Sequence, residues 1–222
     1  MIDPADIDIS NFLTKWYGVP DSKEQERSHC AWLPDPLRSW YDLIGRWTKF
    51  LSAGVRIYDP QQIRVDKGKA VFMADSTGDW FWAFDAKDLK TVYEAELRGE
   101  WRLIPESLPE FLVHLTLMVA ADTANCARLC SQVSNETLPA VLVAMEEIGF
   151  GGWRWPRPGR RMFMSEKLIA NVGPAMDFRA PWRNREGFSS VGISGINQQD
   201  LEYLDGITSI KWVIPDLGDC VS

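Results

Sequence analysis

Two carboxylates, Asp75 and Asp79, lie in a short polar stretch of the segment MADSTGDWFWAFD, between two runs rich in apolar and aromatic residues. A pair of carboxylates can act as general acid and base, as in glycoside hydrolysis. Turns also favour Asp, because its side chain accepts hydrogen bonds from the nearby backbone. We favour the second interpretation, a hairpin whose solvent-exposed tip presents Asp75 and Asp79 to a binding partner.

Other catalytic groups are scarce. A Ser-His-Asp or Cys-His system would have to use His29 or His114, and each is better explained as a structural histidine. The sequence holds no phosphate-binding loop, dinucleotide-binding glycine pattern, zinc-protease helix or nucleophile elbow. We therefore expect a protein that is not an enzyme and that uses no cofactor.

The four cysteines do not define a site. Cys126 and Cys130 are four residues apart, so a helix would place them on one face, and His114 precedes them. A closed zinc site needs four ligands, and only the remote Cys30 and Cys220 are left to complete it. We expect small core residues, no bound metal and no disulfide framework.

The stretch WRWPRPGRR, residues 153–161, is basic and rich in proline. It could bind phosphate or single-stranded nucleic acid by charge and stacking. We prefer a loop whose Trp side chains pack inward and whose Arg side chains pair with nearby acids. Because Trp is also enriched at interfaces, Trp153 and Trp155 join Asp75 and Asp79 as candidate partner-binding residues.

Composition narrows the class of protein. The net charge of −7 argues against a general nucleic-acid binder and is compatible with a basic protein partner, although solubility alone is the preferred explanation of the charge. The acidic start has no signal-peptide core, and no apolar run is long enough for a spanning helix. We expect a soluble, cytoplasmic protein that does not bind membranes, and we leave its oligomeric state open.

Apolar spacing and turn signals give the expected elements. We expect helices over 8–17, 33–45, 107–130, 138–148 and 197–207. We expect strands near 55–58, 70–74, 80–84 and 91–97, and others over 161–172, 187–195 and 209–214. Ser107 and Glu110 have capping-box spacing at the start of the strongest helix. The prediction is a single α+β domain over residues 1–222, with a central, mostly antiparallel sheet flanked by helices.

The order of these features resembles the SUKH superfamily, which includes bacterial toxin-immunity proteins and fungal cell-wall regulators. Four stretches carry the resemblance, which spans roughly residues 15–215: LPDPLRSWYDLIGRW, KAVFMADSTGDWFWAFD, LKTVYEAEL with the later ESLPEFLVHLTLMVAA, and WRWPRPGRRMF. Where family members often carry a Glu-x-Gln type of pair in the hairpin turn, this chain has Asp75-Ser76-Thr77.

The resemblance implies an α+β fold that works by binding another protein and not by catalysis. The expected function is that of an immunity protein that neutralises a cognate bacterial toxin, with an acidic surface that meets a basic toxin domain. One alternative is a regulatory scaffold that binds a signalling or cell-wall partner. Another is an unrecognised hydrolase that uses Asp75, Asp79 or His114.

Overall fold

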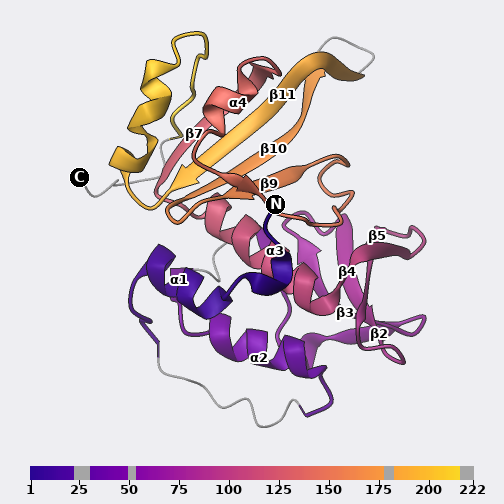
Figure 1. The fold of residues 1–222 in the computed structure, drawn as a ribbon. Helices are drawn as coiled ribbons and strands as arrows, with labels where there is room; N and C mark the ends of the chain where they lie inside the picture. The colour runs from indigo at the N-terminus through magenta and orange to yellow at the C-terminus, as the bar shows by residue number, and fades with distance from the viewer. Residues whose placement is uncertain (23–30, 50–53, 178–182, 216–222) are drawn as a thin grey trace. The chain divides into compact units, whose positions relative to one another are not determined.

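The computed structural model describes residues 1–22, 31–49, 54–177 and 183–215. Contacts divide the chain into two compact units, Pro4–Thr123 and Met1–Asp3 with Ala124–Ser222. Each unit has its own antiparallel sheet and its own helical segments (Figure 1). The predicted α+β class with antiparallel strands is confirmed, and the strands are distributed over two sheets. The assignment of residues 1–222 to one SUKH-like domain stays a prediction.

The sheet of the Pro4–Thr123 unit has the strand order β1-β3-β4-β5-β6, and β2 also pairs with β3. Its strands are β1 (Val55–Ile57), β2 (Arg64–Asp66), β3 (Lys69–Asp75), β4 (Trp80–Asp85), β5 (Thr91–Glu96) and β6 (Arg102–Ser107). In β4, Trp82 and Phe84 point to one face while Phe81 and Ala83 point to the other, as strand alternation requires. Trp82 and Phe84 are fully buried, whereas Trp80 is only half-buried.

Among its described residues, this unit has the α-helices α1 (Ile9–Tyr17), α2 (Asp35–Ile44) and α3 (Leu108–Asp122). The unit also contains the short 3-10 helices η1 (Pro4–Asp6) and η4 (Pro60–Gln62). The predicted capping box of α3 is confirmed. Within the described ranges no helix has both the length and the apolar composition needed to cross a bilayer.

Helix α3 is the centre of this unit, because the sheet and the other two helices all contact it. On the sheet side, the rings of Phe72 and Phe111 meet edge to face with centroids 5.7 Å apart. The Trp40 indole N–H of α2 donates to Thr116 Oγ1 at 2.9 Å. The Trp16 indole N–H of α1 donates to the Ala120 carbonyl at 3.1 Å. One face of the sheet is thereby covered by helix.

The second unit has a five-stranded sheet in the order β7-β11-β10-β9-β8. Its elements are β7 (Cys126–Ser134), α4 (Leu138–Val141), β8 (Glu146–Glu147), β9 (Arg161–Met164), β10 (Leu168–Asp177), β11 (Arg183–Gly195) and the 3-10 segment η5 (Gln198–Gly206). Leu138 and Val141 of α4 and Leu201 and Leu204 of η5 join the sheet residues in one buried core. Ile2 forms a parallel bridge with Ile148, which places the start of the chain in this unit.

Several predicted boundaries are wrong. The helix expected over 107–130 ends at Asp122, and Cys126–Ser134 is strand β7. An apolar run fits either a buried helix or a buried strand, and pairing with β11 decides for the strand. The helix expected over 138–148 is limited to Leu138–Val141 for the same reason, since Glu146–Glu147 pairs with β9.

Two more corrections concern the C-terminal region and the first sheet. The helix expected over 197–207 is the 3-10 segment Gln198–Gly206, with Asn197 as its N-cap. The strand expected over 209–214 is reduced to a bridge between Leu129 and Val213. Strand β6, Arg102–Ser107, is not among the elements expected from the sequence.

Asp75 organises the turn between β3 and β4. Its Oδ1 accepts the backbone N–H groups of Asp79 and Trp80 at 2.8 and 2.9 Å, and its Oδ2 accepts the Thr77 hydroxyl at 2.6 Å. Only 6% of Asp75 is exposed, so the prediction that it lies at a solvent-exposed tip is wrong. Asp79 is exposed, as expected. The turn uses Asp75 as an internal acceptor because the loop's own N–H groups need one.

Replacing Asp75 by Ala should lower the free energy of unfolding by about 2 kcal/mol, because three donors lose a charged acceptor. Urea denaturation would measure the loss. Asp79→Ala is the matched control and should change stability by less than about 0.5 kcal/mol. Equal losses in the two variants would contradict the assigned role.

The same contribution should depend on pH. Burial raises the pKa of Asp75, but hydrogen bonds from Thr77, Trp80, Asp79 and Gly78 outweigh burial and leave the pKa below its ordinary value. The folded pKa is therefore depressed, and the stabilisation is fully present above about pH 4. The stability difference between wild type and Asp75→Ala should shrink as the pH falls below that value.

Candidate functional site

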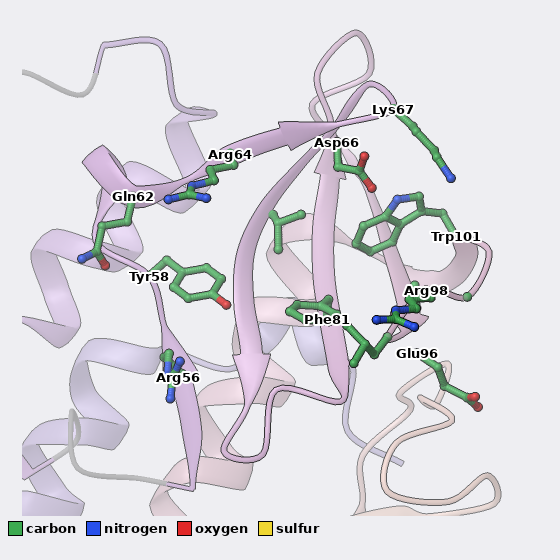
Figure 2. A pocket seen from close by; sticks show the side chains of 14 residues that line it. Arg56, Tyr58, Gln62, Arg64, Asp66, Lys67, Phe81, Glu96, Arg98 and Trp101 are labelled. Atoms are coloured by element: carbon green, nitrogen blue, oxygen red, sulfur yellow. The ribbon is translucent and has the colours of Figure 1, made fainter.

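The main cavity described is a groove of about 620 Å³ on the face of the first sheet opposite α3. Its lining comes from β1 and the segment after it, from β2, from single positions of β3 and β4, from the end of β5, and from the two turns β2–β3 and β5–β6. Figure 2 shows Phe81 in the middle, Tyr58 and Arg64 on one side, and Arg98 and Trp101 on the other. The groove therefore lies entirely within the Pro4–Thr123 unit.

The floor of the groove follows from strand alternation. Phe81 points away from α3 and lies opposite Ala74 on β3 and Ala95 on β5. Val71 and Ala95 complete the apolar floor. Because alanine is small, the ring of Phe81 keeps open space beside it and stays half-buried.

Two tight turns form the ends of the walls. The β2–β3 turn consists of Lys67 and Gly68, whose φ angles of +49° and +81° suit a two-residue type I′ hairpin. In the β5–β6 turn, Arg98 has a φ of +64°. The Leu97 N–H donates to the Asp79 carbonyl at 2.7 Å and fixes this turn beside the β3–β4 turn. Among the described residues, Lys67 and Arg98 are the two non-glycine residues in the left-handed region.

The charge of the groove is opposite to that of the whole chain. Four cations line it, Arg56, Arg64, Lys67 and Arg98, against two carboxylates, Asp66 and Glu96. In the part of the chain that the structure describes, none of the four cations forms an ion pair within 4.0 Å. The groove is therefore locally basic within a protein of net charge −7.

On the same face of the sheet, the nearby cation Lys69 contrasts with the groove cations because it has an acidic partner. The Lys69 ammonium is 2.5 Å from Asp85 and 3.5 Å from the centroid of the Tyr93 ring. The hydrogen bond from Lys69, together with the Lys87 backbone N–H, lowers the pKa of Asp85 to about 2. Lys69 is thus neutralised within the protein, while the groove cations have no such acidic partner among the described residues.

The lining side chains offer several groups that can bind a ligand. The described residues that line the groove include no histidine, cysteine, serine or threonine. They supply aromatic faces and guanidinium groups, which make stacking contacts and charge-assisted hydrogen bonds.

The residues predicted from the sequence fall in different places. Asp75 and Asp79 share one turn, but Asp75 is internal to it. Trp153 belongs to the second unit and is 5% exposed, while Trp155 is half-buried. Their role in binding a partner stays a prediction, and for Asp75 and Trp153 burial leaves little surface for contact.

The basic stretch around Trp153 matches the preferred interpretation in part. Trp153 packs inward, and Arg161 forms an ion pair with Glu147 at 3.3 Å. Arg157 and Arg160 instead line a smaller pocket of about 280 Å³. This pocket lacks the aromatic side chains that line the groove.

The candidate catalytic and metal-binding residues that the structure describes lie within secondary structure or contact a buried side chain. His114 Nδ1 lies 2.9 Å from Glu106 Oε1, and both side chains are buried. Cys126 and Cys130 lie on strand β7, while Cys30 and Cys220 lie outside the described residues. Within the described ranges, no three or more His, Cys, Asp or Glu residues come together to hold a metal ion.

Sequence reasoning missed the groove residues because they are scattered over 46 positions, from Arg56 to Trp101. One local signal was present. In both Lys67-Gly68 and Arg98-Gly99, a long cation precedes glycine in a turn between strands, where Asn or Asp is the common choice.

Replacing Lys67 or Arg98 by Gly should raise the free energy of unfolding by up to about 1 kcal/mol. Left-handed backbone costs other residues about 1–2 kcal/mol, and the greater chain entropy of unfolded glycine offsets part of the gain. Arg64→Gly is the matched control within strand β2 and should destabilise by about 0.5–1 kcal/mol. Urea midpoints that fall in all three variants would show that the two turns carry no such strain.

Comparisons with models of protein families, with curated proteins and with solved structures find no match to this chain. The resemblance to the SUKH superfamily therefore stays a prediction.

Proposed function

We propose that this chain is a non-catalytic protein-binding protein whose contact surface is the groove on the first sheet. The observation that carries the proposal is the lining of the groove. Its half-buried or exposed Tyr58, Arg98 and Trp101 are of the types that dominate binding energy at protein interfaces. The groove cations lack ion pairs within the described chain, so a partner can pair with them.

The narrower proposal is an immunity protein of the cytoplasm that neutralises a cognate toxin by covering its active surface. Support comes from the SUKH-like stretches, from the net charge of −7 and from the absence of histidine, cysteine, serine and threonine among the described residues that line the groove. A basic toxin domain would be attracted to the acidic remainder of the protein. The alternative is a regulatory scaffold that presents the same groove to a signalling or cell-wall protein.

A photo-crosslinking residue placed at Trp101 should capture the partner in the native host. Trp101 is half-buried at the groove, so a bound partner lies within reach of its side chain. The control carries the same crosslinker at Val19, which is 83% exposed in the same unit and does not line the groove. Mass spectrometry would identify the adduct. Adducts that form only at Val19 would rule out the groove as the contact surface.

The identity of the captured protein separates the two classes of partner. Co-expression with this chain should restore growth to cells that produce a toxin partner, and Arg98→Ala combined with Trp101→Ala should abolish that rescue. A captured protein that is not toxic when produced alone would favour the scaffold.

Association with a basic partner should be slowed by salt. The rate constant should fall roughly tenfold between about 20 and 300 mM NaCl, because screening weakens long-range attraction. The dissociation rate should change much less. Stopped-flow or surface-based kinetics would measure both rates, and a salt-independent association rate would refute charge steering.

A further inference from the structure

We propose that the groove binds an acidic segment of a partner protein, one that carries an aromatic or large aliphatic side chain between its carboxylates. The inference rests on the proposed function and adds the chemistry of the ligand. The net charge of this chain favours a partner that is basic as a whole. The groove adds a local requirement, because its positive charge favours a negatively charged segment of that partner.

Charge complementarity is the first support. Arg56, Arg64, Lys67 and Arg98 line the groove and form no ion pair in the described part of the chain. Asp66 and Glu96 line the same groove. Neither carboxylate forms an ion pair within 4.0 Å with any of the four cations. The protein therefore leaves an excess of positive charge at one concave surface, and carboxylates fit it by charge-assisted hydrogen bonds.

The backbone of the two turns is the second support. Lys67 and Arg98 occupy left-handed conformations, which glycine adopts with no strain. Strained positions of this kind cluster at active sites and ligand-binding sites, where the surrounding structure holds them in place. Both side chains line the groove, so the two strained positions hold the cations at the ends of its walls.

The distribution of the cations favours an extended segment over a compact anion. They come from four elements: β1, β2, the β2–β3 turn and the β5–β6 turn. Figure 2 shows them spread around Phe81 and not converging on one point. A nucleotide concentrates its negative charge at one end, whereas a peptide carries its carboxylates on separate residues.

The apolar floor of the groove is the reason to expect an aromatic or large aliphatic side chain in the ligand. Val71, Phe81 and Ala95 form an apolar surface, with the Trp101 indole at its edge. An aromatic or aliphatic side chain would bury this surface while flanking carboxylates reach the cations. The acidic remainder of the chain opposes binding only weakly, because the Debye length is about 8 Å at physiological salt.

The test uses the full chain and fluorescence anisotropy. The probe is a fluorescein-labelled nine-residue peptide with a central Trp flanked by Glu residues. We expect it to bind at least roughly tenfold more tightly than a peptide with Lys for each Glu, and several-fold more tightly than one with Ala for Trp. Binding that does not distinguish Glu from Lys would overturn the inference, as would ATP binding where the acidic peptide does not bind.

Charge reversal locates the site. Arg64→Glu and Arg98→Glu should each weaken binding of the acidic peptide roughly tenfold. Lys87→Glu makes the same change in net charge at an exposed position outside the groove, so it should weaken binding less than about twofold. Equal effects at the three positions would show that binding depends on the net charge of the protein, and would refute the groove as the binding site. Thermal unfolding of each variant would show that the fold is intact.

Failure of this inference is distinguishable from failure of the proposed function. If the native partner crosslinks at residue 101 but the acidic peptide does not bind, the groove is the interface and the proposed ligand chemistry is wrong. If the native partner crosslinks only at Val19, the groove is not the interface and the proposed function itself fails.

Discussion

Burial of helix α3 is the constraint on which the first unit depends. The helix is apolar on nearly all sides, so it must be covered both by the sheet and by other helices. Phe111 meets Phe72 on the sheet side, while Trp16 and Trp40 donate hydrogen bonds to α3 from α1 and α2. The indole N–H groups matter because they satisfy polar atoms at the helix surface while the rings fill space around it. Several of the chain's many Trp residues are thereby used in the core.

Covering one face of the sheet leaves the other face available for binding. The alternation that sends Trp82 and Phe84 to the core sends Phe81 to the open face, where Ala95 lies opposite it. The hairpin turns of the same strands then carry Lys67 and Arg98 to the walls of the groove. The core and the candidate site are therefore two faces of one sheet, and a change in strand register would disrupt both.

Asp75 illustrates how one residue type serves two roles within five positions. Its carboxylate closes the β3–β4 turn by accepting from Thr77, Asp79 and Trp80, while Asp79 remains exposed. Composition suggested an acidic surface that meets a basic partner. The structure adds a basic groove within that acidic chain, because cations distant in sequence line the same groove.

The sequence by itself determined the local elements with strong signals. These include helices α1 and α2, the capped start of α3, and the alternation of strand β4. Only the tertiary structure decided that Cys126–Ser134 is a strand, because an apolar run fits either state until a neighbouring strand pairs with it. It also decided the groove, since pairing of five strands is needed to bring Arg56, Phe81 and Trp101 together. Spacing along the chain reports contacts within one element, whereas the site is made by contacts between elements.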